Sequence, residues 1–203
     1  MTDKPSIRIP DPLPDGVSQA TIGVRGGILR SQFEETSEAL FLASGYVYGS
    51  AAEAEKAFTG EVDRYVYSRY GNPTITMFEE RLRLIEGAPA AFATASGMAA
   101  VFTSLGALLS AGDRLVASRS LFGSCFVVCG EILPRWGIET VFVDGDDLSQ
   151  WEEALSVPTQ AVFFETPSNP MQSLVDIVAV TELAVRGRVT RVDQLEQPVF
   201  AWR

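Results

Sequence analysis

Hydrophobic residues recur with two different spacings from about residue 76 onward. A spacing of three and four residues predicts helices, and these fall at 76–86, 98–109, 123–136, 148–155 and 177–184. Short apolar runs predict buried strands, and these fall at 90–95, 114–117, 140–143 and 161–165. Four successive strand–helix pairs predict an α/β fold with a mostly parallel sheet and helices on both faces. Ligands bind such sheets at the carboxyl ends of the strands.

Polar residues near these helices predict where they start and how they are stabilised. Asp146 or Asp147 is placed to cap the fourth helix, and Asp176 is placed to cap the last one. Glu79 and Arg83 have the i, i+4 spacing of a helical ion pair.

The ends of the chain depart from the regular pattern. Four prolines in the first fourteen residues predict an extended N-terminal arm over 1–30. An N-terminal segment, 31–75, which contains a loop able to bind a ligand, precedes the α/β domain at 76–184. Residues 185–203 lack periodicity and carry a net charge of +2, whereas the whole chain carries −10. We therefore expect this tail not to belong to the preceding domain.

Composition narrows the possible functions. A chain of 203 residues that is 46% hydrophobic is long enough and apolar enough to form a core. The net charge of −10 disfavours nucleic acid or an anionic membrane as a partner. The absence of histidine excludes Ser-His-Asp and Cys-His catalysis and His-ligated metal sites. Only two lysines, Lys4 and Lys56, are available for covalent amine chemistry.

The spacing of the cysteines and the polar N-terminus favour a cytoplasmic protein. Cys125 and Cys129 are spaced i, i+4 and predict core thiols in a reducing compartment, not a redox or zinc pair. The polar, proline-rich N-terminus has no apolar signal segment. The uncharged stretch between Glu86 and Asp113 is long enough for a membrane span, but its prolines, glycines and small residues favour a buried strand and helix.

Four short motifs could bind a ligand. ATASGM, 93–98, joins a predicted strand to a helix, and its backbone N–H groups suit a phosphate; alternatively, Ser96 only caps the helix. YVYSRYGNPT, 65–74, offers Tyr67 and Arg69 as donors to phosphate, or is a surface loop with a solvated arginine.

The other two motifs follow predicted strands. SLFGSC, 120–125, places Phe122 where it can stack on a flat ring, unless it is an ordinary core side chain. ETPSNP, 165–170, holds Asn169 in a turn that either reaches the same site or only leads into the next helix.

In this order and spacing, the four motifs resemble the Cys/Met-metabolism family of pyridoxal 5′-phosphate (PLP) enzymes. The run EGAPAAFATASGMAAVFTSLGALL, together with GDRLVASRSLFGSCFVV, is most similar to the O-succinylhomoserine sulfhydrylases of that family. The resemblance covers about 15–184. It implies the large-domain sheet of PLP fold type I, the aspartate aminotransferase type.

The resemblance also implies roles. Gly97 and Met98 would offer backbone N–H groups to the cofactor phosphate, while Tyr67 and Arg69 would bind the phosphate of a neighbouring subunit in a dimer-based tetramer. Phe122 would stack on the pyridine ring, and Asn169 would bind its hydroxyl group. The implied reaction is γ-replacement, in which O-acyl homoserine and sulfide yield homocysteine for methionine biosynthesis.

The chain departs from the family in what it lacks. Family members are about twice as long, and their Schiff-base lysine follows the region matched here, so neither Lys4 nor Lys56 corresponds to it. Asp193 lies near the place of the family aspartate that pairs with the ring nitrogen, but the expected apolar strand does not precede it. We expect a truncated chain with no catalytic residue and no metal site of its own, inactive alone. The alternatives are a non-catalytic remnant and a half-domain that associates with an intact homologue.

Overall fold

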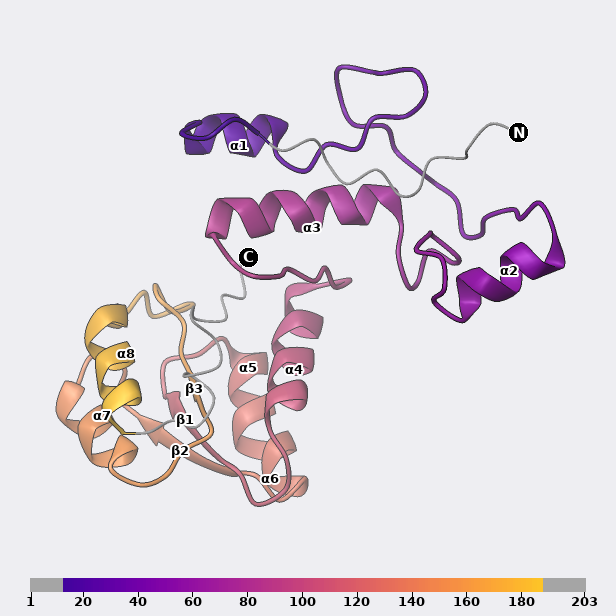
Figure 1. Ribbon diagram of the computed structural model, residues 1–203. Helices are drawn as coiled ribbons and strands as arrows, with labels where there is room; N and C mark the ends of the chain where they lie inside the picture. Colours follow the sequence, from indigo (N-terminus) through magenta and orange to yellow (C-terminus); the bar gives the residue numbers. More distant parts are fainter. Residues whose placement is uncertain (1–12, 188–203) are drawn as a thin grey trace. The chain divides into compact units, whose positions relative to one another are not determined.

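The computed structural model describes residues 13–187, and the chain divides into two compact units, Met1–Ala93 and Thr94–Arg203 (Figure 1). The predicted boundary at residue 76 therefore differs from the structural one, which follows residue 93. Expectations for Lys4, Asp193 and most of the 185–203 tail fall outside the described residues.

The first unit contains three helices, α1 (Gln19–Arg25), α2 (Ala51–Phe58) and α3 (Pro73–Glu86). Helix α1 shows that the extended arm predicted for 1–30 is wrong for this segment. The prolines that suggested it all precede the helix, and the Ser18 side chain caps it by accepting from the Thr21 N–H. The predicted helix at 76–86 is confirmed as α3, which begins three residues earlier.

The chain after α1 packs closely on α3 because it has a glycine at the contact. Gly27 has a φ of 73°, and a Cβ there would lie 2.9 Å from both the Met77 O and the Arg81 N. A side chain would therefore clash with the α3 backbone. Arg81 completes the contact by donating from Nε to the Gly26 O at 2.9 Å.

The strand predicted at 90–95 is absent from the described structure, and so is the Glu79–Arg83 ion pair. A hydrogen bond made by Glu79 is relevant to the missing strand and to the missing ion pair. The Glu79 carboxylate accepts from the Ala93 N–H at 2.7 Å, an N–H that a strand would have used for a neighbouring strand. Arg83 instead forms two 2.7 Å hydrogen bonds with the carboxylate of Glu80.

The second unit is a parallel sheet between two helical layers (Figure 1). Its strands are β1 (Arg114–Ser118), β2 (Glu139–Val143) and β3 (Ala161–Phe163), in the order β2-β1-β3. Its helical segments are α4 (Gly97–Leu108), α5 (Gly123–Val127), the π-helix η1 (Val128–Ile132), α6 (Leu133–Arg135), α7 (Leu148–Leu155) and α8 (Ile177–Arg186). The predicted α/β class and parallel sheet are confirmed, with three strands in the described residues instead of four.

Alternation along β1 divides the apolar residues of this unit between the two faces of the sheet. Leu115 and Ala117 belong to the core under α4 and α5, whereas Val116 belongs to the core under α7 and α8. This alternation follows from the period of two in a strand. Both faces are buried, as a parallel sheet requires.

The predicted helix over 123–136 forms with one irregularity, the π-helical turn η1. Its α-helical parts, α5 and α6, lie on either side of that turn. The helix ends with Trp136 as the C-cap of α6, two residues after Pro134. Asp147 is confirmed as the cap of α7, and Asp176 as the cap of α8.

Both cysteines are buried thiols outside any disulfide, in the core under α4 and α5, which confirms that they are core residues. Burial raises the pKa of Cys129 from 9.0 to about 12. The folded state therefore keeps this thiol protonated in a range where the unfolded chain ionises it. Between about pH 9 and pH 12 the unfolded state binds fewer protons, so stability must fall as the pH rises.

We predict that Cys129 lowers the free energy of unfolding by about 1.4 kcal/mol per pH unit above pH 9. The measurement is urea unfolding at several alkaline pH values, with Cys129→Ala as the reference protein. The difference between the two proteins isolates this thiol from other groups that titrate there. Parallel pH profiles for the two proteins would contradict the assignment.

Among the described helices, none is long and apolar enough to cross a membrane. The uncharged stretch after Glu86 forms a loop and helix α4.

Candidate functional site

The N-terminus of α4 presents free backbone donors. The Ser96 hydroxyl caps the helix by accepting from the Ala99 N–H at 3.1 Å, so Ser96 does cap the helix, and phosphate binding at this end stays a prediction. The first two N–H groups, of Gly97 and Met98, have no hydrogen-bond partner within residues 13–187. A Cβ built on Gly97 would meet nothing within 4 Å, so no other group lies close to the Cβ position of this residue. Capping and anion binding are therefore compatible here, because they use different N–H groups.

Phe122 lies at the start of α5, four residues after β1, with 37% of its surface exposed. It is the N-cap residue of α5, and its own side chain makes no cap hydrogen bond. Its own N–H donates to the Glu165 carboxylate, with both oxygens at 3.0 Å. Glu165 follows β3, which pairs with β1 in parallel register, so both residues lie at the carboxyl edge of the sheet.

Helices α4 and α5 meet close to these N-termini. The Cys125 Sγ lies 3.7 Å from the Met98 Sδ, a contact between the first turns of the two helices. The open donors of α4 and the exposed ring of Phe122 therefore lie in one region of the second unit.

Asn169 lies in the long loop that connects β3 to α8 and is partly buried. The loop is held by its own side chains: the Ser168 Oγ lies 2.7 Å from the Ser173 Oγ, and the Thr166 Oγ1 accepts from the Val175 N–H at 3.1 Å. The turn predicted around Asn169 is thus an ordered segment at the carboxyl end of β3.

Tyr67 and Arg69 belong to the first unit, in the loop before α3. The Arg69 guanidinium lies 5.2 Å from the Tyr67 ring centre and 5.6 Å from the Tyr70 ring centre. No carboxylate within the described residues pairs with Arg69, which is exposed. A cation held against aromatic rings and without an anion of its own is suited to bind one.

Asn72 fixes the shape of this loop. It is 7% exposed, and its Nδ2 donates to the Phe41 O at 2.9 Å and to the Ser68 Oγ at 3.1 Å. Its Oδ1 accepts from the Thr74 N–H and so caps α3. The sequence contains a signal for this role, since an asparagine directly before a proline is typical of a helix N-terminus.

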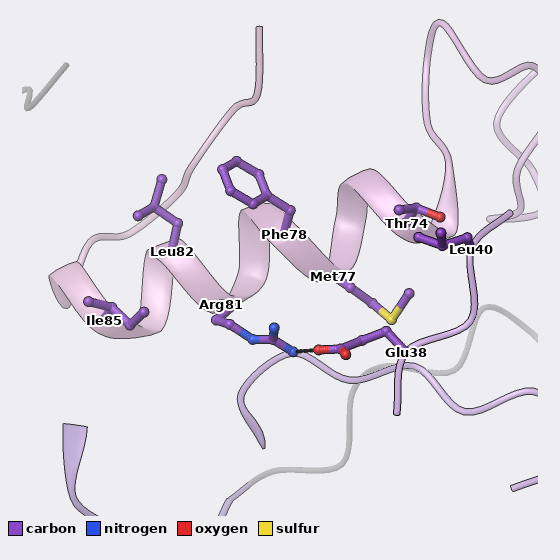
Figure 2. Close-up of a pocket in the computed structure, with 8 residues that line it drawn as sticks. All are labelled: Glu38, Leu40, Thr74, Met77, Phe78, Arg81, Leu82 and Ile85. Atoms are coloured by element: carbon purple, nitrogen blue, oxygen red, sulfur yellow. Dashed lines mark hydrogen bonds and ion pairs between the residues drawn. The ribbon is translucent and has the colours of Figure 1, made fainter. Parts of the chain in front are cut away.

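A hollow of about 300 Å³ runs along α3 in the first unit (Figure 2). Its lining is mostly apolar, with Phe78, Leu82 and Ile85 on α3. Its charged residues, Glu38 and Arg81, bind each other, and the hydrogen bond from Arg81 lowers the pKa of Glu38. None of the predicted cofactor residues lines this hollow.

Within residues 13–187 no group of histidine, cysteine or acidic side chains is arranged to hold a metal ion. The arrangement at the sheet edge instead combines N–H donors, an aromatic face and an amide. Such groups can bind a phosphorylated aromatic ring without a metal.

Comparison with known proteins identifies related sequences. The model of a family described as Cys/Met metabolism PLP-dependent enzyme matches residues 20–194. O-succinylhomoserine sulfhydrylase of Mycobacterium tuberculosis (strain ATCC 25618 / H37Rv) is 85% identical over 91% of this chain and 45% of its own length. The enzyme of the same name from Pseudomonas aeruginosa is 43% identical over 91% of this chain and 48% of its own length. The chain thus spans about half the length of these curated relatives.

Solved structures also match most of this chain, at lower sequence identity. A putative O-acetylhomoserine (thiol)-lyase from Campylobacter jejuni, with a pyridoxyl-lysine phosphate, has a TM-score of 0.77 at 28% identity, covering 86% of this chain and 43% of that one. Cystathionine gamma-lyase from Lactobacillus plantarum, in complex with L-serine, has a TM-score of 0.72 at 31% identity, covering 84% of this chain and 42% of that one.

Proposed function

Since the chain belongs to the Cys/Met metabolism family of PLP-dependent enzymes, we propose that it carries part of the cofactor site of an O-succinylhomoserine sulfhydrylase. The family match confirms the resemblance expected from the sequence, and the match to solved structures confirms the expected α/β fold. The proposed activity rests on the 85% identity to the mycobacterial enzyme of that name. The proposed substrates are O-acyl homoserine and sulfide, and the proposed product is homocysteine.

The open N-terminus of α4 is the observation that carries the cofactor assignment. We assign the phosphate of PLP to the N–H groups of Gly97 and Met98, which have no other partner in the described chain. A Cβ built on Gly97 would have no neighbour within 4 Å, so a ligand can approach this residue closely. The N-terminus of α5 is less suitable, because the Glu165 carboxylate already occupies it and would repel a phosphate.

The remaining residues of the second unit suit the aromatic ring. The exposed Phe122 would stack on one face of the pyridine, and Asn169 would hydrogen-bond its hydroxyl. Bound PLP supplies an electron sink for chemistry at the substrate carbons. A phenyl ring at position 122 orients the cofactor but offers no O–H for proton transfer.

We further propose that Tyr67 and Arg69 serve a second copy of the chain. Their loop exposes a guanidinium that has no anionic partner among the described residues. The first unit also exposes large apolar side chains, including Leu42 at 95% and Val47 at 87%, which favours association with another protein surface. The proposed compartment is the cytoplasm, supported by the two buried thiols that form no disulfide.

The second candidate is a non-catalytic role. The positions of the two lysines in the sequence favour this role when the chain acts without a partner. Residues 94–187, which hold the proposed phosphate and ring contacts, contain no lysine. The chain would then bind a phosphorylated ligand without reacting with it, or would associate with a longer homologue that supplies the amine.

The test of the phosphate assignment is binding of pyridoxine 5′-phosphate, which has no aldehyde and needs no lysine. We predict that Gly97→Pro weakens binding at least about tenfold, because it removes one N–H to a charged ligand. Helix α4 should tolerate this change, since residue 97 is its first residue and Ser96 before it is extended (φ −162°, ψ 161°).

Gly97→Ala is the matched control, because it keeps the N–H and its Cβ meets open space. Calorimetric titration of the three proteins should give similar affinity for the wild type and the alanine variant. Equal affinity of the proline variant would exclude this N–H as a phosphate ligand. A wild-type chain that does not bind the probe would refute the proposed site.

A further inference from the structure

Residue Glu165 makes no ligand contact in the site proposed above, yet it contacts one member of that site directly. Its carboxylate accepts from the Phe122 N–H across 43 residues of sequence. It has no cationic partner among the ion pairs of the described residues. A partly buried carboxylate that is directed to a single backbone N–H calls for an explanation.

The start of α5 lacks the residues that normally fix a helix N-terminus. In a capping box, the third helical residue is a glutamate or glutamine whose side chain accepts from the N–H of the N-cap residue. In α5 the N-cap is Phe122 and the third residue is Cys125, which cannot do this. Glu165, which follows β3, makes the missing contact from outside the helix.

We propose that Glu165 is a positioning residue for the ring of Phe122, and that it acts by fixing the Phe122 backbone at the carboxyl edge of the sheet. The proposal rests on the proposed function for the identity of the ligand that Phe122 faces. Two anchors would then hold the first turn of α5: Glu165 at the Phe122 N–H, and Met98 against Cys125. With the backbone fixed, the exposed ring keeps one orientation relative to the α4 donors.

This role also explains why the residue is an acid. A carboxylate at a helix N-terminus is favoured by the helix dipole and makes a stronger hydrogen bond than a neutral acceptor. Its negative charge excludes phosphate from α5 and leaves α4 as the anion site. Glu165 would thereby set which end of the ligand lies at which helix.

The first test needs no cofactor. Hydrogen exchange of the full 203-residue chain is measured for the Phe122 amide, with the Val116 amide in the middle of β1 as an internal reference. We expect Glu165→Ala to speed exchange at Phe122 by about tenfold or more and to leave Val116 unchanged. Glu165→Gln keeps an acceptor and should restore most of the protection. Unchanged exchange at Phe122 in Glu165→Ala would overturn the proposal.

The second test asks whether Glu165 acts through the ring. Affinity for pyridoxine 5′-phosphate is measured in the wild type, Glu165→Ala, Phe122→Ala and the double variant. We expect each single variant to bind about tenfold more weakly, and the double variant to bind no more weakly than Phe122→Ala. Fully additive losses would overturn the proposal, because Glu165 would then act independently of Phe122.

Glu152→Gln, on the exposed surface of α7, is the control for loss of an acidic charge and should bind like the wild type. If the wild-type chain does not bind the probe, the proposed function fails. The exchange experiment still decides whether Glu165 fixes Phe122, so the two failures are distinguishable.

Discussion

Replacing Trp151 by alanine is expected to remove a large part of the stability of the second unit. The side chain of Trp151 is fully buried on α7, in the core that α7 and α8 form against the sheet. Its Nε1 donates to the Gly145 O at 3.1 Å, and its ring lies edge-on to Phe164 at 6.0 Å. Truncation of a buried tryptophan costs about 3–5 kcal/mol, a large part of the stability of an ordinary domain. Urea unfolding followed by far-ultraviolet circular dichroism measures this loss.

Trp136 provides the matched control, because it is 46% exposed and lies outside that core. It makes one edge-on contact, with Phe102 at 5.4 Å between ring centres. We expect Trp136→Ala to cost about 1 kcal/mol or less. Similar unfolding midpoints for the two variants would mean that the core under α7 and α8 contributes little to stability.

The second prediction with a large expected effect is that the chain forms no covalent bond with PLP through a lysine. When the 203-residue chain is mixed with PLP and treated with borohydride, we expect no stoichiometric pyridoxyl label on any lysine. Lys56, in the last turn of α2, is exposed to solvent. A lysine that reacts with a carbonyl cofactor is normally activated by desolvation or by a neighbouring group. Peptide mass spectrometry after reduction reads the extent and position of labelling.

Denatured chain treated in the same way gives the background for exposed amines, and Lys56→Arg removes the described lysine. Native and denatured samples should show the same low labelling at Lys56. One equivalent of label at Lys4 or Lys56 that requires the folded state would contradict the prediction. The chain would then possess a reactive amine of its own.

The helices and the parallel sheet could be predicted from the sequence because their patterns are local. The apolar spacing of α3, α4 and α7 and the caps Asp147 and Asp176 are contained within short segments. The run at 90–95 shows the limit of this approach. Its apolar residues allow a strand, but a strand also needs a neighbour to receive its hydrogen bonds, and Glu79 binds the Ala93 N–H instead.

The candidate site was predictable in part for the same reason. Gly97, Phe122 and Asn169 each follow or begin an element, so their positions could be inferred from the order of strands and helices. Glu165 was missed because its partner lies in a different strand–helix pair, and periodicity carries no information about contacts between pairs. The available signal was a charged residue directly after the apolar run AVFF.

The π-helical turn η1 lets its helix contain one extra residue without changing the directions in which its two ends face. A π turn holds one more residue than an α turn, and each residue of an α-helix rotates the chain by about 100°. The wider turn absorbs the rotation that the extra residue would otherwise impose on Phe122 relative to Leu133. The start of the helix therefore keeps its orientation at the carboxyl edge of the sheet, while Leu133 near its end stays buried in the core.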